Sequence, residues 1–440
     1  MNTNAKRTVM RLVAGVAAVA TLMGTAACGS SNSSSSDDNT LTVSYWDDEM
    51  QPIKDFIKAN PDIKVKQIRV PGDDYNTKLN QMIVGGTAPD VMLTQEADYV
   101  RFAKNGVTMK LDDKLKDLGI DKSDFQPAVT DIANQVDGYY GFPQGFATEI
   151  MYYNKDMFDA AGVAYPTDDW TWDDYTAAAE KLTKADGSQY GSDSPTFNGV
   201  WYSLIGAAGD KVVDNGKLSF GNGLKKTLEF QKNLVDNKWQ PQPASGSKVS
   251  DMFAAGKAAM TLGGTWLVST YKDVDFKWDI ATIPTAPGAK KYNSLHTSFW
   301  AINAKTKHSA AAEKLVKFLM SKEGQKSMSQ SLGNTPAFQS MMADGYYKVQ
   351  GKNGPSNWSS LEASAKEAKF GYTLVASTPT FNLYDQFNAY VLGQTSLSEV
   401  TGTQVAKANK EITDAIRRQA YRAISIYFFC FLIGGSHDFQ

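Results

Sequence analysis

Cysteine is almost absent from this sequence, whose 440 residues include only Cys28 and Cys430. Two cysteines offer no disulfide framework, and no group of cysteines and histidines has the spacing of a metal site. An exported chain of this length can bury a large core, so it does not depend on disulfides for stability. We therefore expect a globular fold that needs neither a metal nor another cofactor.

Runs of basic residues and common catalytic motifs are also missing. The formal net charge is −2, and it becomes −5 once the leader cations Lys6, Arg7 and Arg11 are left out. Such a weak, mixed charge gives no indication of nucleic acid binding. Because no G-x-S-x-G elbow, H-E-x-x-H pair or Walker loop occurs, we do not expect an enzyme.

The N-terminus has the three parts of a secretory signal. Lys6, Arg7 and Arg11 give a positive start, the apolar run Leu12–Met23 follows, and small residues come next. The run has 12 residues, whereas a membrane span needs about 20. We expect residues 1–27 to be cleaved off rather than kept in the membrane.

Cys28 directly follows the small residues Ala26 and Ala27. This arrangement resembles a bacterial lipobox, in which the new N-terminal cysteine receives lipid, although Thr25 stands where the lipobox usually has an aliphatic residue. Residues 28–40 are mainly Ser, Asn and Asp, which cannot build a core. We expect a protein anchored by lipid on the extracellular side of the cell membrane, with this segment as a tether. The alternative is ordinary secretion with an incidental cysteine.

The mature part opens with alternating strand and helix patterns. Residues 41–45, 63–70 and 91–93 have the apolar pattern of strands, and 53–57 and 75–84 have helical spacing. This β-α-β-α-β order predicts a parallel sheet with helices on both faces. About 400 residues after the tether suggest two domains or one large domain.

Polar and aromatic side chains follow two of these strands. Trp46 and Asp47 come after the first strand, and Gln95 and Glu96 come after the third. Open parallel sheets bind ligands beyond the carboxyl ends of their strands, so we expect these four residues to face one crevice. For Asp47, Gln95 and Glu96 the alternative is a helix cap or a solvated loop.

Other local patterns continue along the chain. Thr171–Asp174 has the form of a capping box at the start of a helix, a short helix is expected near Met252–Phe253, and 258–262 has the pattern of a strand. A helix is expected to follow Ser309. The apolar segment 423–435 is short for a membrane span, and the sequence does not decide its role.

Several short motifs occur in the order that is typical of one family. They are Leu41–Trp46, Asn60–Val65, Gly85–Val91, Asp137–Pro143, Tyr153–Phe158 with Ala161 and Gly162, Trp172 with Tyr175, Phe253–Met260, Gly263–Trp266, and Glu313–Phe318 followed by Gly324 and Gln325. Over roughly residues 41 to 415, the chain thereby resembles the extracellular solute-binding proteins of ABC importers. The resemblance is to the large sugar-binding class that includes the maltose-binding protein.

This resemblance implies an α/β fold of the type II periplasmic-binding-protein kind, with a ligand cleft between two lobes joined by hinge crossings. Lobe one would comprise 41–150 and 298–345, and lobe two 151–297 and 346–420, which leaves 421–440 as an atypical apolar tail. Closure around a carbohydrate, an oligosaccharide by the resemblance, would precede docking on the permease subunits of an ABC transporter. The expected state is a monomer.

A sugar ring has an apolar face and a rim of hydroxyls, so its site needs aromatic surfaces and polar partners. Trp266 matches the family's position at which an aromatic side chain stacks on the ligand. Trp201 lies near the family's cleft, with packing against its own helix as the alternative, and Glu149 could bond the ligand or a hinge amide. Tyr384 and Phe387 match a region that contributes aromatic side chains in some relatives.

Two other interpretations stay open. The same fold could bind a polyamine, an anion or a peptide, of which the polyamine is the main alternative because the candidate side chains mix tryptophan with carboxylates. A lipid-anchored glycoside hydrolase would need two carboxylates roughly 5 to 10 Å apart, and Asp47 and Glu96 would be its candidates. Trp300 is expected in the core, and His296 is open between a structural role and a ligand role.

Overall fold

The computed structural model describes residues 40–46, 50–195, 197–244, 251–349, 351–370, 377–415 and 417. The expected leader, the expected lipidation residue Cys28, the candidate Asp47 and the apolar tail lie outside these ranges. Contacts group the residues from Asn39 onward into one compact unit. No helix within the described ranges is both long and apolar enough to cross a membrane.

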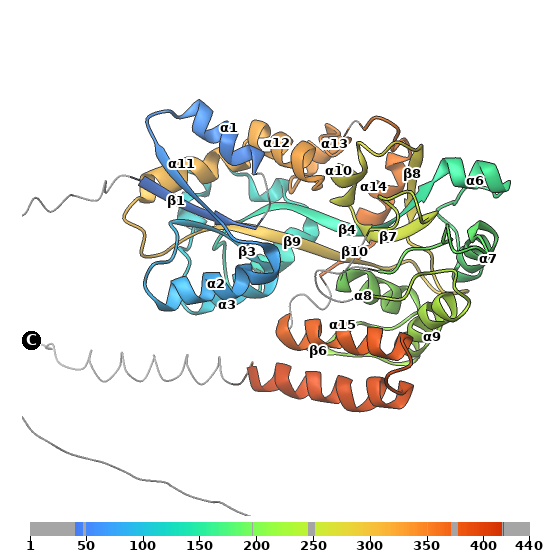
Figure 1. Cartoon of the computed structure of the whole chain (residues 1–440). Helices are drawn as coiled ribbons and strands as arrows, with labels where there is room; N and C mark the ends of the chain where they lie inside the picture. The colour runs from blue at the N-terminus through green and yellow to red at the C-terminus, as the bar shows by residue number, and fades with distance from the viewer. Residues whose placement is uncertain are drawn as a thin grey trace, which may run out of the picture. The chain divides into compact units, whose positions relative to one another are not determined.

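Strands and helices alternate from β1 to α3 and are mixed along the rest of the chain (Figure 1). The strands are β1 (Thr40–Tyr45), β2 (Lys64–Arg69), β3 (Val91–Gln95), β4 (Phe142–Asn154), β5 (Val213–Asp214), β6 (Lys217–Leu218), β7 (Met260–Gly264), β8 (Trp278–Thr282), β9 (Asn293–Ile302) and β10 (Ala368–Lys369). The helices are α1 (Gln51–Ala59), α2 (Gly72–Val84), α3 (Glu96–Lys104), α4 (Leu115–Leu118), α5 (Pro127–Ala133), α6 (Lys155–Ala161), α7 (Trp172–Leu182), α8 (Asn198–Ala207), α9 (Asn222–Asp236), α10 (Leu267–Tyr271), α11 (Ser309–Met320), α12 (Lys322–Leu332), α13 (Gln339–Ala343), α14 (Trp358–Glu367) and α15 (Ser377–Val391), with a π-helical turn at Glu399–Gln404 before helical residues 405–415.

The first three strands form the parallel sheet that the sequence predicts. β1 lies between β2 and β3 and is parallel to both, with Val43 opposite Gln67 on one side and Val91 on the other. Figure 1 shows α1, α11 and α12 on one side of these strands and α2 and α3 on the other. The expected helical cover of both faces is therefore confirmed.

Two long antiparallel strands, β4 and β9, extend this sheet (Figure 1). β9 pairs with β3 through residues 298–302, and it pairs with β4 from Leu295 to Trp300. β4 pairs with β9 up to Thr148 and then with β7 and β8 from Glu149 onward. β4 is thus one long strand that changes partners at Thr148 and Glu149.

Separate apolar clusters pack against the two halves of β4. One buries side chains of β1, β3, α1 and α11 together with Phe142 and Trp300. Another contains Met151 and Tyr153 with side chains of α7, α8 and β7. Trp300 is fully buried, which confirms its expected place in the core. The exact lobe boundaries drawn from the sequence remain a prediction.

Local hydrogen bonds explain where two of the expected elements begin. The Thr171 side chain and the Asp174 carboxylate bond each other's backbone N–H, which confirms the capping box of α7. The expected helix near Met252 is a succession of turns instead. Its first N–H groups, those of Met252 and Phe253, donate to the carboxylate of Asp193, which lies elsewhere in the chain.

Candidate ligand site

Helix α2 positions two candidate side chains at the ends of β1 and β3. Trp46, which is half-buried, packs edge-on against Tyr75 with ring centroids 5.1 Å apart. Gln95 accepts a hydrogen bond of 2.9 Å from the Asn76 amide. Tyr75 in turn donates to the Leu93 carbonyl at 2.7 Å. The first turns of α2 therefore hold the carboxyl edge of the parallel sheet.

Glu96 is the first residue of α3, and its side chain points to β9 rather than capping its own helix. Its carboxylate accepts the backbone N–H of Thr297, and the residue is 7% exposed. Burial raises the pKa of Glu96, and the nearby His296 and the Thr297 N–H oppose that rise. The carboxylate is thus part of the packing between α3 and β9, next to His296.

Four side chains, Glu149, Phe197, Trp266 and His296, meet where β4 changes partners; we call them the aromatic–acid cluster. Phe197 lies edge-on to both Trp266 and His296, with ring centroids 5.1 Å apart in each case. His296 Nε2 is 3.0 Å from Glu149 Oε1. Phe197, Trp266 and His296 are each partly exposed, whereas Glu149 is fully buried. The cluster therefore combines accessible aromatic surface with a carboxylate beneath it.

Glycines make room for this cluster on two sides. Gly264 lies opposite Glu149 in the ladder between β4 and β7, and a Cβ on Gly264 would come within 1.9 Å of the Trp266 ring. A Cβ on Gly199, in the first turn of α8, would come within 2.5 Å of Glu149 Oε1 and 2.6 Å of His296 Nε2. Any other residue at either position would displace a member of the cluster.

Asn293 holds the backbone at the same crossing. Its amide oxygen accepts the N–H of Glu149 at 2.9 Å, and its amide nitrogen donates to the Glu149 carbonyl at 2.6 Å. Asn293 is 2% exposed. The backbone of β9 pairs with β10 at this residue, and it pairs with β4 only from Leu295 onward. One side chain thus replaces the strand neighbour that β4 would otherwise lack.

Two side chains, those of Asp193 and Tyr384, hold residues 193–195, which come shortly before Phe197 in the chain. Asp193 accepts the N–H groups of Ser194, Met252 and Phe253, with distances of 2.8, 2.7 and 3.2 Å. The Tyr384 hydroxyl donates to the Pro195 carbonyl at 3.1 Å. Tyr384 is therefore placed as a support of the Phe197 segment, with part of its ring packed on a core cluster.

The structure places Trp201 away from the cluster. Its side chain is 1% exposed and packs against Phe387, with ring centroids 5.4 Å apart. This packing is the alternative that the sequence left open for Trp201, and its expected role as a ligand contact stays a prediction. Every residue of α8 is buried, so its sequence has no polar face that would have shown which aromatic side chain faces inward.

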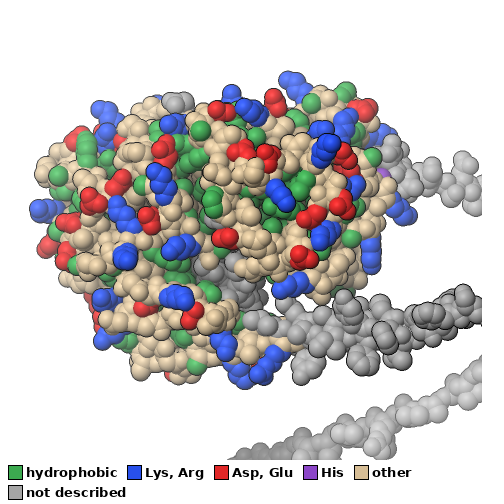
Figure 2. Space-filling model, turned by 180° about the vertical axis from the view of Figure 1, so that it is seen from behind, with side chains coloured by type: hydrophobic (Ala, Val, Ile, Leu, Met, Phe, Trp, Pro, Cys, Tyr) green, Lys and Arg blue, Asp and Glu red, His purple; other side chains and the backbone are tan. Residues whose placement is uncertain are grey.

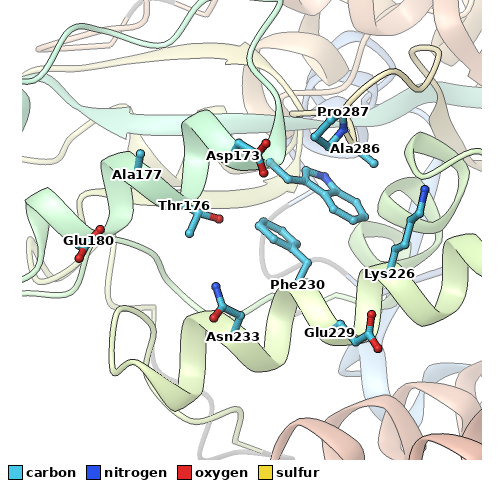
Figure 3. A pocket seen from close by; sticks show the side chains of 11 residues that line it. Asp173, Thr176, Ala177, Glu180, Lys226, Glu229, Phe230, Asn233, Ala286 and Pro287 are labelled. Carbon is cyan, nitrogen blue, oxygen red and sulfur yellow. The ribbon is translucent and has the colours of Figure 1, made fainter.

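A separate pocket of about 650 Å³ lies between α7 and α9 (Figure 3). Trp172 and Phe230 stack on its wall with ring centroids 4.6 Å apart, and the exposed Asp173, Lys226 and Glu229 lie around it. The indole N–H of Trp172 is already bonded to the Pro284 carbonyl at 3.1 Å. This pocket has no lining residue in common with the aromatic–acid cluster.

Charged side chains of both signs are interspersed over the face seen in Figure 2, with apolar side chains gathered towards its middle. Within the described ranges, no three acidic, histidine or cysteine side chains are placed to hold a metal ion.

A family model for bacterial extracellular solute-binding proteins matches residues 51–353, which is more than half of the chain. The chain belongs to this family. Among curated relatives, the multiple sugar-binding protein of Streptococcus mutans is 29% identical over 323 residues, which cover 67% of this chain and 74% of the relative. A maltooligosaccharide ABC transporter solute-binding lipoprotein of Streptococcus pneumoniae is also 29% identical, with 74% and 79% covered.

Solved structures of the same architecture support the two-lobe fold. An ABC substrate-binding protein of Listeria monocytogenes, solved in complex with cycloalternan, superposes with a TM-score of 0.76 at 25% identity. The match covers 85% of this chain and 99% of that protein. The two-lobe, maltose-binding-protein-like fold expected from the sequence is thereby confirmed.

In this solute-binding protein, the change of partners along β4 lies at the point where the aromatic–acid cluster forms. The sequence singled out Trp266 and Glu149, and it left His296 open. It missed Phe197 and Asn293.

Proposed function

We propose that this protein is a lipid-anchored, extracellular solute-binding protein that captures a carbohydrate and delivers it to the permease of an ABC transporter. The observation that carries the proposal is the aromatic–acid cluster, which sets Trp266 and Phe197 beside a buried carboxylate. Stacking on an aromatic ring suits the apolar face of a sugar, and a carboxylate accepts hydrogen bonds from its hydroxyls.

The relatives support the same ligand class. They are named for multiple sugars, arabinooligosaccharides, galactooligosaccharides and maltooligosaccharides. The Listeria monocytogenes protein was solved with an oligosaccharide bound. We therefore propose a neutral oligosaccharide as the ligand, with Trp266, Phe197, Glu149 and His296 contacting it and Trp46 and Gln95 facing it from the parallel sheet.

The anchoring part of the proposal rests on Cys28 and the tether that follows it. The proposed partners are the carbohydrate, the permease and the membrane, and the proposed state is a monomer. We assign no catalytic role, because the family is one of binding proteins.

The first test is thermal unfolding of the mature chain, residues 28–440, against maltotriose, arabinotriose, galactotriose and cycloalternan, with spermidine as the control. A ligand at 100 times its Kd adds about 2.7 kcal/mol to the folded state. Because unfolding entropy is about 2.1 cal/mol/K per residue, this raises the Tm by roughly 3 °C. We expect a shift with one saccharide class and its loss in Trp266→Ala. A shift with spermidine alone would favour the polyamine interpretation.

A further inference from the structure

Glu149 carries a buried carboxylate that the described residues do not satisfy. The residue is 0% exposed, and Oε2 has no hydrogen-bond partner among the residues that the structure describes. Oε1 is 3.0 Å from His296 Nε2, a contact with the distance of an ion pair but without the angles of a hydrogen bond. A buried carboxylate without hydrogen bonds is costly. Folding alone gives no reason to keep it there.

Glu149 lies between the first turn of α8 and the residue that seats the Trp266 ring. The carboxylate touches the start of α8 at Gly199, where the helix dipole stabilises an anion. Gly264, opposite Glu149 in the ladder, lies directly under the Trp266 ring. The unsatisfied oxygen therefore belongs to the same cluster as the exposed aromatic rings.

Glu96 provides a contrast within the same region. It is also buried, but its carboxylate is bonded to the N–H of Thr297, so the chain itself supplies its partner. A carboxylate that stabilises the fold has such partners. Glu149 has an imidazole on one side and no partner for Oε2 on the other.

We propose that Glu149 is a specificity-determining residue whose carboxylate is reserved for hydrogen-bond donors of the ligand and excludes anionic saccharides. This inference rests on the proposed function, because it assumes a saccharide next to Trp266. An ionised carboxylate only accepts hydrogen bonds, so it selects a ring edge that presents hydroxyl or ammonium groups. A uronate or sugar phosphate would bring a like charge into a buried site, which costs affinity.

Mutation distinguishes a carboxylate that binds the ligand from one that stabilises the fold, because the two have opposite effects on the ligand-free Tm. Residues kept for binding often destabilise the folded state, so replacing them raises stability while function is lost. Glu149→Gln keeps the shape and removes the buried charge. We expect the ligand-free Tm to rise by about 2 to 5 °C and the affinity for a neutral saccharide to fall roughly 10- to 100-fold, the worth of hydrogen bonds to a charged group.

The experiment compares the mature chain with Glu149→Gln, His296→Gln and the double variant, and with Glu180→Gln as an exposed control on α7. Each is unfolded thermally without ligand, and then with the neutral oligosaccharides above, digalacturonate and trehalose 6-phosphate. His296→Gln should lower the Tm in the wild-type background but much less in the Glu149→Gln background, because the carboxylate that it compensates is then absent. Glu180→Gln should change neither the Tm nor the ligand shift.

Three results would overturn the inference: a lower ligand-free Tm for Glu149→Gln, an unchanged neutral-saccharide shift in that variant, or binding of an anionic saccharide by the wild type. The ligand-free comparison decides whether Glu149 is structural even when no saccharide binds. Failure of the proposed function, which is the absence of any saccharide shift in the wild type, is therefore distinguishable from failure of this inference.

Discussion

Replacing Asn293 with alanine tests how the crossing between the two halves of β4 is held. The substitution removes two hydrogen bonds to the Glu149 backbone, of 2.9 and 2.6 Å, and one of 3.5 Å from Ser203, and it leaves the buried N–H and carbonyl of Glu149 without their partner. Each unsatisfied buried group costs about 1–3 kcal/mol, so we expect the two groups together to cost about 2–6 kcal/mol. With unfolding entropy of about 2.1 cal/mol/K per residue over roughly 400 residues, this lowers the Tm by about 2 to 7 °C.

The assay is urea unfolding followed by tryptophan fluorescence, with scanning calorimetry to give the Tm. Asn237→Ala is a matched control, because Asn237 also bonds a backbone carbonyl, that of Asn233, but it is exposed. It should cost less than about 0.5 kcal/mol. If Asn293→Ala were as stable as this control, water or a backbone shift would replace the side chain, and the bridging role assigned to Asn293 would be wrong.

Two further predictions concern the supports of the site. Burial raises the pKa of Asp193 from 3.8 to about 7. Because the folded chain then holds this proton more tightly than the unfolded chain, Asp193 contributes stability that is fully present below about pH 4. This contribution, roughly 4 kcal/mol, is lost as the pH rises to about 7. Asp193→Asn should flatten the fall in Tm between pH 4 and 8, and an unchanged slope would contradict the assignment. Gly264→Ala should displace the Trp266 ring and abolish the saccharide-dependent Tm shift, while the far-ultraviolet circular dichroism spectrum stays unchanged. If the Tm shift were retained, saccharide binding would not depend on the position of the Trp266 ring against Gly264.

The sequence was informative where structure is local. The alternation of strands and helices predicted the parallel arrangement of β1, β2 and β3, and the residues after β1 and β3 lie at one edge of that sheet. The capping box at Thr171 was readable because both partners lie within four residues. Such features depend on short-range periodicity and on side chain to backbone bonds within one turn.

The aromatic–acid cluster depends on contacts that no local pattern contains. Glu149 and His296 meet because β4 and β9 pair in one register, with Ala147 opposite His296. A shift of one residue in that pairing would turn the imidazole to the other face of the sheet. The packing of Trp201 was not predictable for a related reason, since helix α8 is buried on all sides and its polarity does not reveal which side chain faces the cluster.

The position of β9 has a consequence for how the chain reaches its folded state. Val91 of β3 pairs with Ile302 of β9, so the N-terminal sheet lacks one neighbour until about two hundred further residues are present. Pairing over such a sequence distance is slow, because a long loop must close before the contact forms. The strand that completes the N-terminal sheet therefore comes from a part of the chain far beyond β3. The chain's own topology delays completion of the first sheet until most of the polypeptide has been made.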